Sequence, residues 1–216
     1  MDGRPALLAT MALVVVSVGC LGFVLGGEPL RFTASEATVE NDTRDGAGYR
    51  TINVTEERFD RTFSIAGQSR RVIANTVIAR YGKRPGAVGT NESVGAVAIV
   101  STPAIEVNDE TLNPLGRASA SELAESFQST YGGVNVSNAS ANTTIETLGT
   151  TTNVTQFPGE ATVDGTTVDV YVEVMRVQHG DDFVVGVGIY PRAVAAVERP
   201  EVLSMFGAID HRAGDG

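Results

Sequence analysis

Apolar and polar residues alternate in two blocks of the chain, and one stretch with helical spacing separates the blocks. In the first block, residues 59–65 and 71–81 carry apolar side chains at even spacing on either side of a turn at 66–68. This spacing predicts a β-hairpin in which Phe59, Phe63 and Ile65 face the same way. The next apolar run, 94–100, is bounded by turn residues and predicts a central strand that is buried on both faces.

A helix is predicted at about 120–131, where Leu123, Phe127 and Tyr131 repeat every four residues. Ser119 and Glu122 have the spacing of a capping box, in which each side chain satisfies an amide of the other. Two glycines follow and end the helix. We expect the apolar stripe to pack into the core and not to form a binding face.

The second β block follows a polar stretch, 134–144, which is predicted to be a loop. Its predicted strands are 144–148, 151–157, 160–163, 166–177 and 183–190. The pair Asp164-Gly165 predicts a tight hairpin turn. Along 166–177, four valines alternate with Tyr171 and Met175, so the two sets face opposite ways. Pro200 is predicted to be the first residue of a short closing helix that extends to Ala208.

These elements predict an α+β domain at 31–210, with a mainly antiparallel sheet of about seven strands flanked by two helices. Residues 211–216, which include His211, are predicted to be a frayed tail. The 216 residues are enough for one domain with a real core.

The segment Pro5–Gly27 contains no charge and includes the only cysteine, Cys20. Arg4, the apolar run 6–16 and the sequence Ser-Val-Gly-Cys that ends at Cys20 are typical of a lipoprotein signal. We therefore predict a signal peptide at 1–19, lipidation of Cys20 and a lipidated tether at 20–30. An uncleaved transmembrane helix is the alternative, because about twenty apolar residues span a bilayer. Either reading places the remaining chain outside the cell membrane.

The charge of the chain agrees with an acidic extracytoplasmic protein. The formal net charge is −10, and the 16 basic residues are all arginine except Lys83. An acidic chain with arginine in place of lysine indicates a haloarchaeal protein, although a GC-rich genome also favours arginine. Nucleic acid is not an expected partner, since phosphate neutralisation requires clustered basic residues.

Seven Asn-x-Ser/Thr sequons occur in the chain, and most lie in predicted loops. They begin at Asn41, Asn53, Asn91, Asn135, Asn138, Asn142 and Asn153. Sequons arise by chance in Asn- and Thr-rich sequences, but their number in an exported chain predicts N-glycosylation at some of them.

Few residues suggest catalysis or metal binding. The cluster 179–182 (HGDD) could bind a divalent cation or transfer a proton, but hairpin-turn chemistry with solvated carboxylates is favoured. No Gly-x-Ser-x-Gly motif occurs, and Gly186 and Gly188 are expected to allow close packing against a strand. The basic residues 70, 71, 80, 83 and 84 are expected to be solvated charges at a strand edge. We therefore predict no catalytic, cofactor or metal site.

Several segments resemble a haloarchaeal lipoprotein family of unknown function. They are 20–23 (CLGF), 28–32 (EPLRF), 37–39, 61–63, 66–70 (AGQSR), 101–103, 112–116 (LNPLG), 164–172 and 179–191 (HGDDFVVGVGIYP). The family carries no assigned activity, so the resemblance implies a location and no mechanism. Residues 119–206 are also similar, at the level of the fold, to PsbP-like domains, which serve mostly as binding or assembly factors.

The sequence thus predicts an extracytoplasmic, membrane-anchored lipoprotein that is not an enzyme. Its expected role is a binding or assembly module for an envelope protein partner. The alternative is a solute-binding or sensing lipoprotein, which would require a deep pocket with convergent polar groups.

Overall fold

The computed structural model describes residues 28–65, 68–83, 95–107, 110–130, 133–163 and 165–212. The segment Pro5–Gly27 with Cys20 lies outside these residues, as do the sequon at Asn91 and the residue Tyr131. Among the residues described, no helix is long and apolar enough to cross a membrane.

A nine-stranded sheet forms the centre of the described part of the chain, in the order β1-β4-β5-β12-β11-β10-β8. In addition, β3 pairs with β4, and β9 pairs with β10. The strands are β1 (Leu30–Thr33), β3 (Tyr49–Ile65), β4 (Gln68–Lys83), β5 (Gly95–Pro103), β8 (Val134–Val136), β9 (Ala141–Thr147), β10 (Thr150–Val163), β11 (Thr166–His179) and β12 (Asp182–Pro191). The strands pair antiparallel except β1, which runs parallel to β4. The α+β class is therefore confirmed, but the sheet is mixed and larger than predicted.

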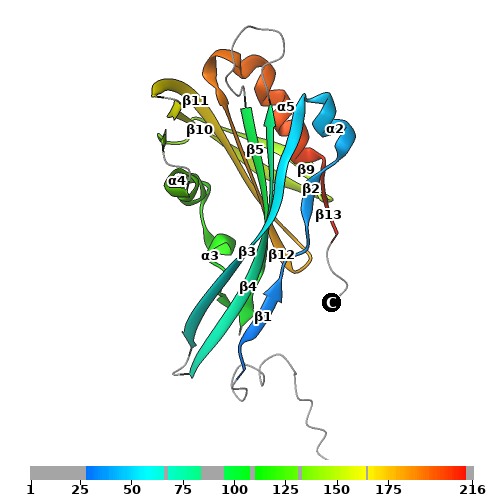
Figure 1. Ribbon diagram of the computed structural model, residues 1–216, viewed down its shortest axis with the longest axis vertical. Coiled ribbons are helices and arrows are strands. Elements are labelled where there is room, and N and C mark those ends of the chain that lie inside the picture. The colour runs from blue at the N-terminus through cyan, green and yellow to red at the C-terminus, as the bar shows by residue number, and fades with distance from the viewer. Residues whose placement is uncertain are drawn as a thin grey trace, which may run out of the picture.

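In the described residues, two short strand pairs and four helices surround this sheet (Figure 1). Two further pairs of strands are β2 (Ala37–Val39) with β13 (Ile209–His211), and β6 (Glu106–Val107) with β7 (Glu110–Thr111). The helices are α2 (Asn41–Gly46), α3 (Pro114–Arg117), α4 (Ala120–Thr130) and α5 (Ala195–Gly207), preceded by a 3₁₀ turn at Arg192–Val194. The described residues thus contain two α-helices more than predicted.

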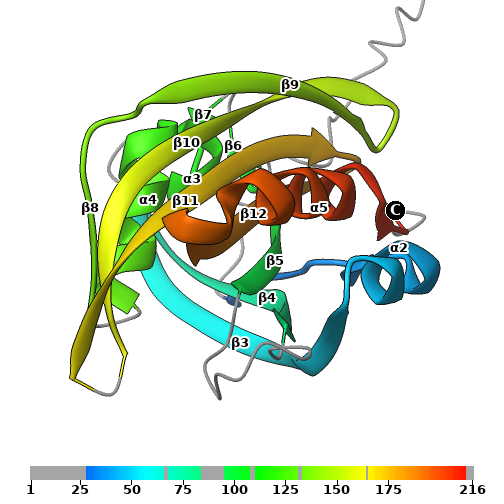
Figure 2. The same ribbon diagram turned by 90° about the horizontal axis from the view of Figure 1, so that it is seen from above.

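The two longer helices pack on opposite faces of the central strands, so the fold has three layers (Figure 2). On β11, Val172 and Val174 join the apolar cluster of α4, whereas Met175 and Val177 join the cluster of α5. This alternation follows from the period of two in a β-strand, and it confirms the two faces predicted for 166–177.

Two glycines of β12 allow α5 to approach the sheet closely. A Cβ atom at Gly188 would lie 2.5 Å from Val202 Cγ1, and one at Gly186 would lie 2.8 Å from Phe206 Cε1. Real Cβ atoms do not approach so closely, so a side chain at either position would force α5 away from the sheet. The packing role predicted for Gly186 and Gly188 is confirmed.

The α4 helix begins as predicted, with a capping box. The backbone N–H of Ser119 donates to Glu122 Oε2 at 2.7 Å, and the backbone N–H of Glu122 donates to Ser119 Oγ at 3.2 Å. The hydrogen bond from Ser119 holds the pKa of the Glu122 carboxyl below its usual value.

Three predictions at the level of elements are wrong. The segment 134–144 contains β8 and the start of β9, because the long strand β10 offers both of them a partner that the local sequence does not reveal. The closing helix begins at Ala195, with Pro200 inside it, because Glu198 and Arg199 are fixed by residues of the sheet. His211 is not frayed: it lies in β13, paired with β2, and is buried.

Candidate functional site

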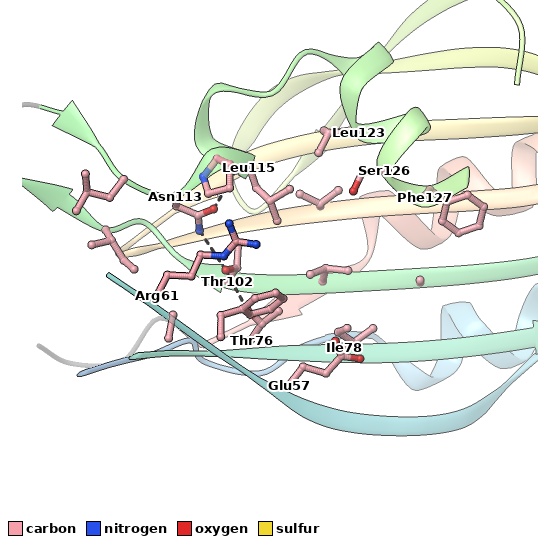
Figure 3. Close-up of a pocket in the computed structure, with 18 of the residues that line it drawn as sticks. Glu57, Arg61, Thr76, Ile78, Thr102, Asn113, Leu115, Leu123, Ser126 and Phe127 are labelled. Atoms are coloured by element: carbon pink, nitrogen blue, oxygen red, sulfur yellow. Dashed lines mark hydrogen bonds between the residues drawn. The ribbon is translucent and has the colours of Figure 1, made fainter. Parts of the chain in front are cut away.

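An apolar groove with a volume of about 540 Å³ opens on the α4 side of the sheet. Its walls come from β3, β4, β5 and β12 on one side and from α4 and the segment before it on the other (Figure 3). The apolar lining residues are Phe59, Phe63, Val72, Ala74, Ile78, Ala98, Val100, Ile105, Leu112, Pro114, Leu115, Leu123, Phe127, Val185 and Val187. The polar ones are Glu57, Arg61, Thr76, Arg80, Thr102, Asn113 and Ser126.

The hairpin of β3 and β4 supplies one wall of the groove through its strand period. Phe59 lies opposite Ala74, and Arg61 lies opposite Val72. Side chains directly opposite each other in an antiparallel pair project from the same face, so alternate residues of both strands point into the groove. The sequence correctly places Phe59 and Phe63 on one face. That face is not closed core, however, since Phe59 is 49% exposed.

The α4 helix supplies part of the opposite wall. Leu123 is buried, and it contacts the core while it also lines the groove. Phe127 is half-buried and also lines the groove. The predicted packing of the α4 stripe into the core is therefore confirmed, and Leu123 and Phe127 of this stripe also line the groove.

Charged side chains on β3 and β4 lie along the groove. Arg80 Nη2 lies 3.3 Å from Glu57 Oε1, and its Nη1 donates to Thr55 Oγ1 at 2.9 Å. Arg61 also lines the groove. Among the described residues, no hydrogen bond or ion pair to Arg61 is found.

One end of the groove has a buried polar floor (Figure 3). Thr102 Oγ1 accepts hydrogen bonds from Thr76 Oγ1 at 3.0 Å and from Asn113 Nδ2 at 3.1 Å. Asn113 Nδ2 also donates to the carbonyl of Pro103 at 2.6 Å. All three of these polar side chains are buried, so the groove combines an apolar wall with polar groups at fixed positions.

The two histidines of the chain meet in a separate cluster on the other face of the sheet. His211 Nδ1 lies 2.9 Å from His179 Nδ1, and His211 Nε2 lies 3.0 Å from Asp182 Oδ2. Asp182 is buried, which contradicts the prediction that the carboxylates of 179–182 lie in solvent; only Asp181 is exposed in that pair. The sequence could not suggest the cluster, because β13 brings His211 to the hairpin from 32 positions away.

This histidine cluster does not have the geometry of a catalytic triad. Ser101 Oγ lies 3.3 Å from His211 Nε2, the same nitrogen that faces Asp182. In a triad the serine and the carboxylate occupy different ring nitrogens, so that one orients the base and the other gives up its proton. Within the described residues, no group of three or more His, Cys, Asp or Glu side chains could hold a metal ion.

A polar network joins α5 to the first hairpin. Lys83 Nζ lies 2.7 Å from Glu198 Oε1 and also contacts Glu201, and the Tyr49 hydroxyl donates to Glu198 Oε2 at 3.1 Å. Burial and the neighbouring Glu198 carboxylate raise the pKa of Tyr49 well above 10.0. Burial opposes the charge of Lys83, but hydrogen bonds to both glutamates raise its pKa overall.

The other basic residues predicted at a strand edge have separate surroundings. Arg71 forms a two-point pair with Asp60, and its hydrogen bond holds the pKa of that carboxyl below the usual value. Arg70 is buried. Arg84 lies outside the described residues. The described basic residues of this set are therefore dispersed along β4, and the prediction that all of them are solvated is wrong for Arg70 and Lys83.

A second network lies under α5 around Glu173, which is fully buried on β11. Glu173 Oε1 accepts from Tyr190 Oη at 2.6 Å, Gln156 Nε2 at 2.7 Å and Arg199 Nε at 2.9 Å. Burial and the hydrogen bond to Glu173 raise the pKa of Tyr190 well above 10.0. Because four elements meet at this one carboxylate, the network fixes α5 on the sheet.

The sequons that the structure describes are all exposed. They are Asn41, Asn53, Asn135, Asn138, Asn142 and Asn153. Four of them lie on strands, Asn41 begins α2, and Asn138 lies between strands. The strand at Asn153 agrees with the prediction, whereas the strands at Asn135 and Asn142 replace a predicted loop. Exposure is required of a glycosylation acceptor, so each of these six positions stays available for the predicted modification.

Comparison with known proteins assigns the chain to a family. The family described as a domain of unknown function, DUF6517, matches residues 36–210, and the chain belongs to it. No curated protein matches the chain. The family description states no activity, so the groove is the only feature described above that suggests a function.

Two solved structures match the chain at low TM-scores. Cyanobacterial PsbP from Synechocystis is 8% identical with a TM-score of 0.37, over 87% of this chain and 96% of that one. A Pseudomonas aeruginosa protein of unknown function, PA94, is 9% identical with a TM-score of 0.33, over 65% of this chain and 89% of that one. The predicted likeness to PsbP-like domains is thus found at a low score, and it carries no argument about function.

Proposed function

We propose that this chain is a membrane-anchored, extracytoplasmic binding protein, without enzymatic activity, whose binding site is the groove beside α4. The observation that carries the proposal is a pre-formed apolar groove of about 540 Å³ with polar groups fixed at one end. Small-molecule sites have volumes of roughly 300–1,000 Å³, mainly apolar walls and a few placed polar groups.

The groove favours a small apolar or amphipathic ligand over a protein partner. Helix α4 and strand β3 wall it on two sides, so an occupant would lie between two walls and not on a flat surface. The structure thus supports the solute-binding alternative more strongly than the assembly module that the sequence first suggested. The exposed Phe59 would become buried when the groove is filled, which supplies a favourable apolar contribution.

The location of the protein rests on the sequence. An apolar leader with Cys20 at its end and an acidic, sequon-rich body support an anchor on the outer face of the membrane. A membrane-facing position would supply apolar ligands that are scarce in water.

Photocrosslinking in the full-length protein tests the proposed site. A diazirine-bearing palmityl alcohol is offered to the protein in phosphatidylcholine nanodiscs, and adducts are mapped by mass spectrometry. We expect adducts within 57–63 and 112–127, and we expect Ala98→Phe, which fills the groove from β5, to remove them. Labelling that avoids these segments, or that Ala98→Phe leaves unchanged, would refute a ligand site in the groove.

A further inference from the structure

Polar and apolar side chains are unevenly distributed along the groove. Thr102 and Asn113 lie at one end, and the Arg61 side chain extends from β3 toward that end (Figure 3). Ile78 and Phe127 lie toward the other end. A ligand that fills such a groove matches it best when its own polar group is at one end of an apolar body.

The charges along the groove are not balanced. The carboxylate of Glu57 is paired with Arg80, at 3.3 Å. Arg61 projects from the same face of β3, four residues from Glu57, and no carboxylate within the described residues pairs with it. This is notable in a chain with 26 acidic and 16 basic residues, where acidic partners for an arginine are plentiful. The exposed Arg61 therefore has no carboxylate partner within the described residues, and its charge at the groove is accessible to an anion from outside the chain.

Thr102 adds a neutral donor, toward which the Arg61 side chain extends (Figure 3). Its hydroxyl oxygen accepts from both Thr76 and Asn113. A threonine hydroxyl carries two acceptor sites and one hydrogen of its own. Because both acceptor sites are occupied, that hydrogen is left to donate to a further acceptor, and Thr102 is buried on the floor of the groove. An anionic oxygen between Arg61 and Thr102 would satisfy both donors, and hydrogen bonds to charged groups are the stronger ones.

We propose that the groove binds an anionic amphiphile, with a carboxylate or phosphate held by Arg61 and Thr102 and a single apolar tail lying toward Ile78 and Phe127. This inference rests on the proposed function and specifies its ligand class. Arg61 is the specificity-determining residue, because the apolar wall by itself would accept neutral and anionic tails alike.

A matched pair of probes separates this inference from the proposed function. Diazirine-bearing palmitic acid and palmityl alcohol are compared in the full-length protein in phosphatidylcholine nanodiscs. We expect the acid to label the groove segments about tenfold more than the alcohol, the size expected of one hydrogen bond to a charged group. Arg61→Gln should remove this preference, and Arg61→Lys should retain most of it.

Arg58→Gln is the matched control, since Arg58 projects from the opposite face of β3 and lies 3.6 Å from Asp60. Each probe partitions into the bilayer equally for every variant. Partition therefore cancels when the ratio of acid labelling to alcohol labelling is compared between variants. Equal labelling by acid and alcohol, unaffected by Arg61→Gln, would overturn the anionic ligand and leave the groove as an apolar site. Absence of groove labelling by both probes would overturn the proposed function as well.

Discussion

His211 Nε2 lies 3.0 Å from Asp182 Oδ2, and this contact joins the last described strand to the hairpin of β11 and β12. The same carboxylate oxygen accepts the backbone N–H of Ser35 at 2.9 Å. Asp182 therefore connects Ser35 and His211, which lie near opposite ends of the described chain. Because Asp182 and His211 are both buried, removal of one would leave the other without its partner away from water, which costs more than breaking an exposed pair.

Asp182→Asn is expected to destabilise the protein by about 1–2 kcal/mol, because it keeps the volume but removes the charge that both donors face. Denaturant unfolding measures the change. Asp181→Asn is the matched control: its side chain is exposed, and it should change the free energy of unfolding by less than about 0.5 kcal/mol. Equal effects of the two substitutions would contradict a structural role for Asp182.

Gly188→Ala is expected to cost about 1–3 kcal/mol, since the new Cβ would lie 2.5 Å from Val202 Cγ1 and α5 would have to shift. Gly46→Ala provides the control at the end of α2, where a Cβ would meet nothing within 4 Å. That substitution should be neutral or stabilising by up to about 1 kcal/mol. The two substitutions are compared by their midpoints of denaturant unfolding. If Gly188→Ala does not change the midpoint, the close approach of α5 to the sheet is refuted.

Lys83→Met is expected to destabilise the protein by about 3 kcal/mol, because it leaves the buried Glu198 carboxylate without its cation. The double variant Lys83→Met/Glu198→Gln should recover part of this loss, since it removes the unpaired charge as well. Thermal unfolding of the two variants measures the difference. A double variant no more stable than the single one would show that the ion pair is not the source of the effect.

Stability is expected to fall as pH rises above about 10, since the pKa values of Tyr49 and Tyr190 are both raised in the folded protein. Unfolded tyrosines lose their protons near 10.0, whereas these two keep theirs, so the folded state binds more protons there. Their contribution is fully present below pH 10 and is lost as pH rises through the folded pKa values. Between about pH 8 and 11, the free energy of unfolding in urea should decline less steeply with pH in Tyr190→Phe than in the wild type. If the dependence on pH is the same in the variant and the wild type, the raised pKa of Tyr190 is contradicted.

The anchor leads to a prediction about mass. Lipoprotein processing at Cys20 would remove residues 1–19 and add a lipid, and Cys20→Ser should abolish both. Intact mass spectrometry of membrane fractions measures the change. If Cys20→Ser has the processing and membrane retention of the wild type, the segment is not a lipoprotein signal, and a retained transmembrane helix becomes the better reading.

Local patterns were sufficient to predict elements whose signals lie close together in the chain. The capping box at Ser119 and the two faces of β11 are examples, because each depends on neighbours within a few positions. The same holds for the packing role of Gly188, since a glycine inside an apolar strand already suggests a close approach. The limits of α5 could not be predicted, because its first turns are fixed by distant residues such as Lys83 and Glu173.

The sequence by itself determined the α+β class, the apolar faces of the strands and the acidic charge, and it supplies the whole case for an anchored extracytoplasmic protein. Only the tertiary structure decided that Phe59 of β3 and Phe127 of α4 line one open groove, and that Arg61 has no partner among the described residues. The physical reason is that an alternating pattern specifies which way a side chain points but not what covers it. Whether an apolar face becomes core or a site depends on where α4 packs on the sheet.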